Sequence, residues 1–409
     1  MLDSCALFAW GCDEDGQLGI ARDDSRASLA NESPNASSPV ELRAFAGARV
    51  ARIAAGSRNS FAVLANGTMF SWGWNSHRTL ALSDDELAEV KTNAPREVSA
   101  AKDVRGVACG GWHACACSFD GSVLCWGGNE YNQCAFATTT EGNEEGDGGE
   151  ATREWAPKKA AVFPPRRALG RERNVIEVTC GGFSSFALCK SGVVFEWGQT
   201  TEDDEPHGDP RALDCLGKAV LEISAGAFHL LLRCERDVLS YGNGMYGQLG
   251  LGATGASAAP RVIEHFGGDF EPKTVAAGGW HSACVSRSGE LYCWGRGEYG
   301  RLGLGDDCRD KVVPQIVRVV TSNEGEMKFD AVSLGGSHSV ALTRDGEVMS
   351  WGRNSLGRLG RVPRNASPAC GFPERVIFPP LPDGAYWRVT QISAGGRHTL
   401  ALATKTRPS

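Results

Sequence analysis

Residues 275–303 read VAAGGWHSACVSRSGELYCWGRGEYGRLG, and weaker copies of this stretch recur along nearly the whole chain. The stretch predicts a β-hairpin, because residues 281–286 and 290–294 are short runs of small, apolar and aromatic residues separated by a turn that contains Gly289. The chain then leaves through a glycine-rich exit that includes Gly300, where glycine accepts positive φ angles that other residues avoid. The chain is therefore organised as repeats of one antiparallel unit.

Two markers within this unit are counted independently. The first is a Trp-Gly anchor, with tyrosine in one copy, and its seven copies start at Trp10, Trp72, Trp126, Trp197, Tyr241, Trp294 and Trp351. The second stands three residues after a glycine and is most often histidine, and its seven copies are Asn59, His113, Ser184, His229, His281, His338 and His398. Two counts of seven predict an all-β fold, a seven-bladed β-propeller of four-stranded blades.

The two ends of the chain complement each other. Residues 5–11 form the second half of a repeat with no first half before it, whereas residues 387–403 supply the opening strands of a repeat. An array whose ends complete one blade exposes no open sheet edge. We therefore expect the N- and C-terminal strands to pair and close the ring, so that residues 1–409 form a single domain.

Three stretches interrupt the regular spacing of the markers. They predict polar loop insertions at about residues 21–39, 136–156 and 200–210. The second contains an acidic, glycine-rich run at residues 138–154, which we expect to be disordered. The third lacks the Gly-Gln-Leu-Gly element found in other copies, so its blade is expected to be the most divergent.

Composition narrows the classes of partner. The chain has 42 Lys and Arg against 49 Asp and Glu, a net charge of −7, and no basic tail, which argues against direct binding to nucleic acid. The N-terminus lacks the positive region and apolar run of a signal peptide, and no stretch approaches the roughly 18 apolar residues of a membrane span. We expect a soluble intracellular protein of the cytoplasm or nucleus, with no membrane partner.

Cysteine usage gives no sign of a metal site. The 15 cysteines are odd in number and scattered, and none form the CxxC pairs that zinc sites use. We expect reduced, buried thiols, no metal and no cofactor. The hairpin allows Cys284 and Cys293 to lie opposite each other, an arrangement that would permit a disulfide, but in a reducing compartment we expect free thiols.

The repeats resemble those of the regulator of chromosome condensation family. The shared pattern is A-x-G-x-x-H-[ST]-x-A-[LV] followed by x-x-G-x-[LV]-x-x-W-G-x-N-x-x-G-[QR]-L-G, and residues 333–360 are its best copy. The resemblance covers essentially the whole chain and implies a seven-bladed propeller closed by its termini. It implies no single activity, because the family includes an exchange factor for the small GTPase Ran, a plant ultraviolet-B photoreceptor, and propellers joined to ubiquitin-ligase modules. In the photoreceptor, the light-sensing tryptophans occupy the position two residues before the histidine. This chain has only Gly, Ser and Ala at that position, which argues against light sensing by that route.

The residue just before the histidine marker carries the main site hypothesis. In chain order this position holds Arg58, Trp112, Phe183, Phe228, Trp280, Ser337 and Arg397. Four successive blades thus offer an aromatic ring, and ring closure makes the first and last arginines neighbours. Trp and Arg often anchor protein interfaces, so these positions predict a face for an acidic partner segment with apolar anchors. A second interpretation, in which each ring packs between neighbouring blades, stays open.

The repeat markers themselves are expected to be structural. We expect each histidine among His113, His229, His281, His338 and His398 to bond to the backbone of its own blade, and Trp72, Trp126, Trp197, Trp294 and Trp351 to fill the core. No P-loop, nucleophile elbow, paired metal-ligand motif or dinucleotide fingerprint is present, so we do not expect an enzyme. The sequence favours a non-catalytic platform for a protein partner. The alternatives are an exchange factor for a small GTPase and a homodimer through the aromatic face.

Overall fold

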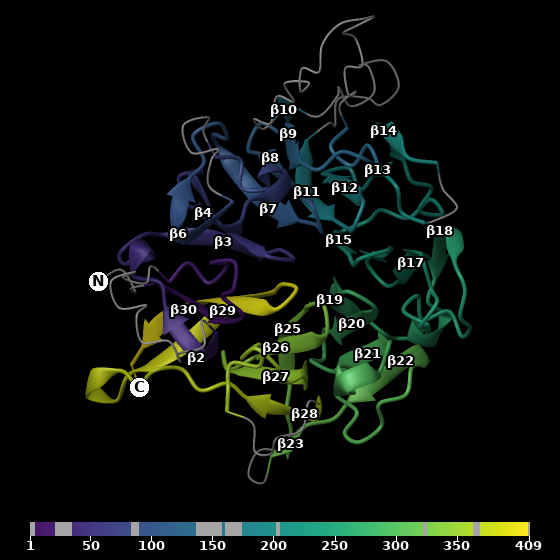
Figure 1. Ribbon diagram of the computed structural model, residues 1–409. Helices are drawn as coiled ribbons and strands as arrows, with labels where there is room; N and C mark the ends of the chain where they lie inside the picture. The colour runs from purple at the N-terminus through teal and green to yellow at the C-terminus, as the bar shows by residue number, and fades with distance from the viewer. Residues whose placement is uncertain are drawn as a thin grey trace, which may run out of the picture.

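The computed structural model describes residues 5–20, 35–82, 90–135, 158–159, 174–201, 205–321, 325–362 and 369–407. Within these ranges the strands form seven four-stranded antiparallel sheets and one two-stranded hairpin. Figure 1 shows the sheets arranged in a ring, each sheet forming one blade. The predicted seven-bladed β-propeller is confirmed.

Six blades follow the order of the chain, with the first strand of each nearest the axis (Figure 1). The first blade consists of β3 (Val50–Ala55), β4 (Asn59–Leu64), β5 (Met69–Trp74) and β6 (Lys91–Glu97). The second consists of β7 (Val104–Cys109), β8 (His113–Ser118), β9 (Val123–Gly127) and β10 (Lys158–Lys159). The third consists of β11 (Val175–Cys180), β12 (Ser184–Cys189), β13 (Val194–Gly198) and β14 (His207–Ala212). The fourth blade consists of β15 (Glu222–Ala225), β16 (His229–Arg233), β17 (Val238–Gly242) and β18 (Ser257–Val262). The fifth consists of β19 (Pro272–Ala277), β20 (His281–Ser286), β21 (Leu291–Gly295) and β22 (Lys311–Val317). The sixth consists of β25 (Phe329–Leu334), β26 (His338–Thr343), β27 (Val348–Arg353) and β28 (Ala369–Arg375).

Short elements connect the blades. They are the hairpin of β23 (Val320–Thr321) and β24 (Gly325–Glu326) and the 3-10 turns η2 (Arg43–Phe45), η3 (Ser76–Arg78), η5 (Glu264–Phe266), η6 (Glu298–Gly300) and η7 (Pro382–Gly384). Among the described residues, no helix is long and apolar enough to cross a membrane.

The seventh blade joins both ends of the chain. It consists, from the axis outward, of β29 (Tyr386–Ala394), β30 (His398–Thr406), β1 (Cys5–Gly11) and β2 (Ala36–Glu41). In Figure 1 these purple and yellow strands lie side by side. β1 pairs with β30 from Cys5 opposite Thr404 to Gly11 opposite His398. Closure of the ring by the terminal strands is therefore confirmed.

The hydrophobic core lies between neighbouring blades. Every residue of β8, which reads HACACS, is buried, because both faces of a strand near the axis are covered by the adjacent blades. In one such layer, Leu7 and Leu400 of the closing blade belong to the same cluster as Ala62 and Trp72 of the next blade. Each blade therefore depends on its neighbours for its burial.

Two predicted insertions partly overlap outer strands. β2 begins at Ala36, inside the stretch 21–39, and β14 begins at His207, inside the stretch 200–210. Residues 21–34 and 202–204 lie outside the described residues, as does the whole of 136–156. Both outer strands carry exposed polar residues that the sequence pattern assigns to loops, such as Ser37 and Asp209.

Candidate protein-binding face

The residue before the histidine marker occupies the same backbone site in each of the seven described blades. Its carbonyl accepts a hydrogen bond of 2.7–3.0 Å from the amide that follows the Trp-Gly anchor. The seven acceptors are Arg58, Trp112, Phe183, Phe228, Trp280, Ser337 and Arg397. Because these turns stand at the same end of every blade, the seven side chains share one face of the propeller.

Aromatic side chains on this face contact one another from blade to blade. The ring centroids of Phe183 and Phe228 are 5.8 Å apart, and those of Phe228 and Trp280 are 5.1 Å apart. Tyr131 lies 4.3 Å from Phe183, and Tyr246 lies 5.4 Å from Trp280. Both tyrosines come from the loops that follow the Trp-Gly anchors. The rings therefore form a continuous row over four blades.

A second aromatic group lies on the preceding blades. Trp112 packs edge-on against Trp74 at 5.7 Å and against His77 at 5.1 Å. The guanidinium of Arg58 lies 4.3 Å from the centroid of a Trp74 ring and donates hydrogen bonds of 2.5 and 2.6 Å to Asp15. We use the name aromatic arc for both groups together, that is, for Trp74, Trp112, Tyr131, Phe183, Phe228, Tyr246 and Trp280.

The aromatic arc is neither fully buried nor fully exposed. Trp112 has 41% of its surface in solvent, whereas Phe183, Phe228 and Trp280 are half-buried. The rings thus contact the neighbouring blade, as the packing interpretation expects, and keep part of their surface available to a partner. Amphipathic or large rings in such partly covered positions are the usual anchors of protein interfaces.

Arginine side chains continue this face beyond the aromatic arc. The guanidinium of Arg296 lies 4.5 Å from the ring centroid of Tyr246, and that of Arg353 lies 4.8 Å from Tyr299. Carboxylates contact several of the arginines: Glu298 pairs with Arg296 and Arg301, Asp15 with Arg58, and Glu14 with Arg397. Cations stacked on rings present both charge and flat apolar area.

Two further arginines lie beneath the surface of this face. Arg301 and Arg358 are 2% and 3% exposed. Arg358 donates to the hydroxyl of Ser337 at 2.7 Å, and its pKa is lowered to about 10, first by burial and then by the charges of Arg353 and Arg397. The positive charges of several arginines therefore lie close together on this side of the propeller axis. We use the name arginine sector for Arg58, Arg296, Arg301, Arg353, Arg358 and Arg397.

Sequence reasoning missed part of this face. It did not single out Arg296 and Arg353, which directly follow the Trp-Gly anchors, or the tyrosines that precede the Gly-Gln-Leu-Gly-like element. These are fixed positions of the repeat, and hairpin topology places them at the same end of the blade as the predicted residues. The missed tyrosines are Tyr131, Tyr246 and Tyr299.

The histidine markers join neighbouring blades. Nε2 of each imidazole lies 2.7–3.0 Å from a hydroxyl of the next blade. The pairs are His398 with Ser60, His113 with Ser185, His229 with Ser282, His281 with Ser339, and His338 with Thr399. The predicted imidazole bond to the backbone of the same blade is therefore wrong for Nε2. Within the blade it is the histidine carbonyl that accepts, from the amide of the glycine three residues earlier.

The serine hydroxyls fix the direction of these bonds. Ser282, for example, donates its single hydrogen to the carbonyl of Gln248 at 2.7 Å, so Nε2–H of His229 is the donor to the serine. Burial lowers the pKa of His229 to about 3 and that of His398 to about 4. The imidazoles are neutral at physiological pH and hold blades together.

At the two junctions without a histidine, the next blade also lacks the matching hydroxyl. Asn59 stands where a histidine would reach the next blade, and the position it faces is Ala114; likewise Ser184 faces Leu230. An unpaired hydroxyl or imidazole at a buried junction would be costly. The loss of both partners together fits their action as a pair.

The Trp-Gly anchors also cross the blade junctions. Each indole donates to a backbone carbonyl at 2.9–3.2 Å, and the pairs are Trp10 with Arg358, Trp72 with Gln17, Trp126 with Thr79, Trp197 with Gln133, Trp294 with Gln248 and Trp351 with Arg301. The exception is the anchor of the blade that follows the one lacking the Gly-Gln-Leu-Gly element. There Tyr241 replaces tryptophan, and its hydroxyl donates to Glu196 at 2.8 Å.

Comparison with known proteins agrees with this architecture. A model of the RCC1-like domain matches residues 5–326, and models of the regulator of chromosome condensation (RCC1) repeat match residues 329–358 and 345–402. The chain belongs to the RCC1-like family. This RCC1-like chain is 28% identical to the E3 ubiquitin-protein ligase HERC2 of Mus musculus over 411 residues, which cover 98% of the chain but 8% of the ligase.

Two further similarities concern RCC1-like proteins of similar size. The secretion-regulating guanine nucleotide exchange factor of Mus musculus is 27% identical over 373 residues, covering 83% of this chain and 73% of that protein. The crystal structure of Prp20p from Saccharomyces cerevisiae, described with its binding to Gsp1p and histones, superimposes with a TM-score of 0.74 at 21% identity, covering 100% of this chain and 93% of that one. The second similarity shows the fold alone.

The cysteines of this RCC1-like chain are arranged differently from the prediction. Cys284 faces Tyr292 and Cys293 faces Ala283, so the expectation that Cys284 and Cys293 lie opposite each other is wrong by one residue of register. Because side chains alternate along a strand, this shift places the two thiols on opposite faces of the hairpin. All 15 cysteines are free thiols. They are also not uniformly scattered, since six of them belong to one core cluster.

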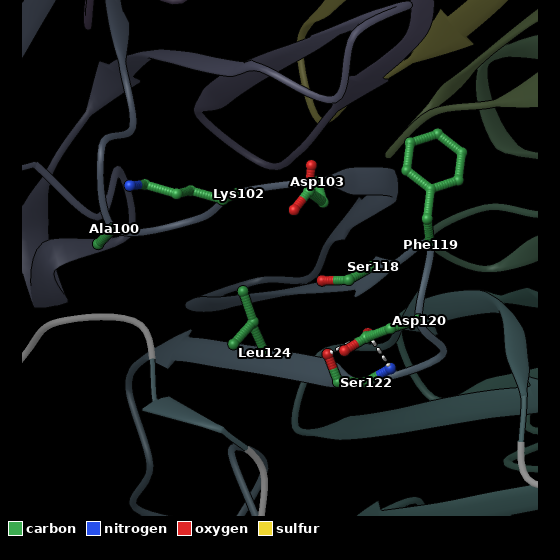
Figure 2. A pocket seen from close by; sticks show the side chains of 8 residues that line it. All are labelled: Ala100, Lys102, Asp103, Ser118, Phe119, Asp120, Ser122 and Leu124. Atoms are coloured by element: carbon green, nitrogen blue, oxygen red, sulfur yellow. Dashed lines mark hydrogen bonds between the residues drawn. The ribbon is translucent and has the colours of Figure 1, made fainter.

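The opposite face of the RCC1-like propeller carries an open pocket of about 490 Å³ (Figure 2). It lies where the β8–β9 hairpin turns, at the end of β8 remote from His113. Asp120 accepts hydrogen bonds from the amide and hydroxyl of Ser122 at 2.9 and 2.7 Å, so this carboxylate serves its own turn. Phe119, 59% exposed, stands at one end of the group. The pocket lacks the clustered rings and arginines of the other face.

Proposed function

We propose that this RCC1-like propeller is a non-catalytic interaction platform that binds an acidic protein segment with apolar anchors on the face formed by the aromatic arc and the arginine sector. The observation that carries the proposal is the junction of these two surfaces at Tyr246, where the ring contacts Trp280 at 5.4 Å and Arg296 at 4.5 Å. A partner segment lying across this junction meets flat apolar surface on one side and cationic surface on the other. Both surfaces are typical of interface hot spots.

Electrostatics support the sign of the partner. The pKa of Arg358 is lowered first by burial and then by the charges of Arg353 and Arg397, so these two positive charges act on it. A carboxylate of the partner reduces this repulsion, whereas a cationic segment increases it. The affinity is therefore expected to fall as salt concentration rises, because ions screen the exposed arginines.

The proposal is tested with peptides selected from a random display library against the full chain. We expect the selected peptides to carry Asp or Glu next to aromatic or aliphatic residues. In fluorescence anisotropy, the double variant Trp112→Ala/Trp280→Ala should weaken binding about 30-fold, the loss expected when hot-spot rings are truncated. Phe119→Ala removes an exposed ring from the opposite face and serves as the matched control. Equal affinities for the parent and the double variant, with both folded, contradict the proposal.

Exchange-factor activity on a small GTPase is the second candidate function. It is favoured by the 27% identity to the secretion-regulating guanine nucleotide exchange factor. The two functions differ in one measurement. An exchange factor accelerates release of fluorescent nucleotide from a GTPase that it binds, whereas a platform leaves the release rate unchanged. A homodimer through the aromatic arc is a further outcome, which light scattering would reveal as a doubled mass that Trp112→Ala/Trp280→Ala reduces to that of a monomer.

A further inference from the structure

Sulfur and imidazole ligands converge at one blade junction, between β8 and β11. One ring nitrogen of His113 and the Sγ atoms of Cys115 and Cys180 lie within 4.8 Å of one another, and all three residues are buried. Cys125, on β9, places its Sγ atom 2.9 Å from that of Cys115. Three strands from two blades thus contribute one imidazole and three thiols. Zinc sites in proteins are built from this ligand set.

The convergence is specific to this junction. The four other histidine junctions have apolar residues where Cys115 and Cys180 stand. The counterparts of Cys115, two residues after the histidine, are Leu231, Ala283, Val340 and Leu400, and those of Cys180 on the next blade are Ala277, Leu334, Ala394 and Ala55. The repeat fold alone therefore does not call for a thiol at either position. Core packing explains a single cysteine such as Cys293, but not the meeting of three sulfurs with an imidazole.

We propose that His113, Cys115 and Cys180 bind one Zn²⁺ ion, with Cys125 as the fourth ligand. Ligands at about 2.0–2.3 Å from a tetrahedral ion stand roughly 3.3–3.8 Å from one another. His113, Cys115 and Cys180 need inward shifts to reach this spacing. Cys125 lies outside the group of ligand atoms within 4.8 Å of one another, so its Sγ has to move away from Cys115 and toward the other two ligands. The cysteines bind as thiolates, so each releases its proton when the ion enters.

The histidine can reach the ion without loss of the rest of the junction. Nε2 of His113 lies 2.7 Å from the Ser185 hydroxyl, and that hydroxyl donates to the carbonyl of Gln133 at 2.8 Å. The indole of Trp197 donates to the same carbonyl at 2.9 Å. If Nε2 binds zinc, its proton moves to Nδ1 and the bond between imidazole and serine is lost, whereas the two bonds to Gln133 remain.

The location gives the ion a structural role. It would link the blade of β8 to the blade of β11. The second of these blades is the one that lacks the Gly-Gln-Leu-Gly element. A metal cross-link between two blades stabilises the folded chain, because the ion binds the folded state. This inference is independent of the proposed binding face.

The test uses the full chain, expressed in zinc-supplemented medium and purified under reducing conditions. Elemental analysis is expected to find about one zinc per chain, as for a closed structural site. After removal of the metal by unfolding with chelator, refolding with Co²⁺ should produce the near-ultraviolet absorption of thiolate-to-cobalt charge transfer, and excess Zn²⁺ should abolish it. Cys115→Ser and Cys180→Ser should each lose the bound zinc and the absorption.

Cys293→Ser is the matched control, because the buried Cys293 occupies the position of Cys125 in β21 but faces Ala283, where Cys125 faces Cys115. It should keep the zinc and the cobalt spectrum. A chain that carries no zinc both as purified and after refolding with Zn²⁺ would overturn the proposal. So would zinc binding that survives the combined Cys115→Ser/Cys180→Ser substitution. Thermal unfolding separates loss of metal from failure to fold, since Zn²⁺ should raise the Tm of the parent but not that of the cysteine variants.

Discussion

At the scale of the residue, the histidines of this propeller act as one half of a pair. His281 donates to Ser339 across a blade junction at 2.9 Å, and both side chains are buried. Where histidine is absent at Asn59, the opposing residue is Ala114. A histidine that appears in five copies of a repeat is predictable as structural from the sequence. Its partner is not, because the hydroxyl belongs to the next blade, 53 to 72 residues away in the chain in four pairs and 338 residues away in the pair of His398 and Ser60.

A double-mutant cycle measures this pairing. His281→Asn and Ser339→Ala should each lower the free energy of unfolding by about 1–3 kcal/mol, because each leaves the other buried group without its partner. The double variant should lose less than the sum, by about 1 kcal/mol. Urea unfolding gives the four free energies. Strict additivity would show that the two groups do not interact.

Stability should also depend on pH through these imidazoles. The pKa of His229 is lowered to about 3 in the folded chain, against about 6.5 when unfolded. As pH falls below about 6.5 the unfolded state binds the proton first, so the stabilisation present above that pH is progressively lost down to about pH 3. His229 should therefore contribute a slope approaching about 1.4 kcal/mol per pH unit in this window.

The variant His229→Asn isolates one of these contributions. Asparagine occupies the same position at Asn59 and does not titrate. The free energy of unfolding, measured by urea titration from pH 7 to 5, should therefore fall less steeply for the variant than for the parent. Parallel curves would mean that His229 is protonated equally in both states.

At the scale of the element, the blade and its closure were readable from the sequence. The seven copies of each marker predict the blades, and the half-repeats at the two ends predict their union in one sheet. The outer strands were less accessible. β2 and β14 contain Pro39 and Pro210 and many polar residues, and such sequences read as loops because an outer strand is only half covered by the fold.

Removal of residues 2–10 tests the closing blade. The deletion takes away most of β1, which stands between β30 and β2, and so leaves two unpaired strand edges and an open ring. We expect loss of cooperative unfolding or aggregation, monitored by circular dichroism during heating. A truncated chain with the melting temperature of the parent would rule out closure by β1.

A single substitution gives a milder version of the same test. Phe8 of β1 is 1% exposed, and its ring centroid lies 5.1 Å from those of Phe378 and Trp387. Phe8→Ala should lower the free energy of unfolding by about 3–5 kcal/mol. Phe119→Ala, at an exposed phenylalanine, should change it by less than about 0.5 kcal/mol.

At the scale of the whole molecule, one face differs from the other. Repeat geometry brings Trp112, Phe228 and Trp280 to the same end of their blades, and this much of the candidate site followed from one sequence position. Only part of the cationic half did. Arg58 and Arg397 occupy that same position, whereas Arg353 and Arg358 come from other positions of the repeat, and only the folded blade places them beside Arg397. The cysteine cluster was invisible for the same reason, since Cys115 and Cys180 belong to different blades.

The measurement that most directly tests the binding face is affinity capture from native extract with quantitative mass spectrometry. It compares the parent chain, Trp112→Ala/Trp280→Ala and Phe119→Ala at equal folded concentration. We expect partners that contain acidic segments with apolar residues to be captured by the parent and by Phe119→Ala, and to be lost with the double variant. Identical partners for all three chains would contradict the assignment of this face.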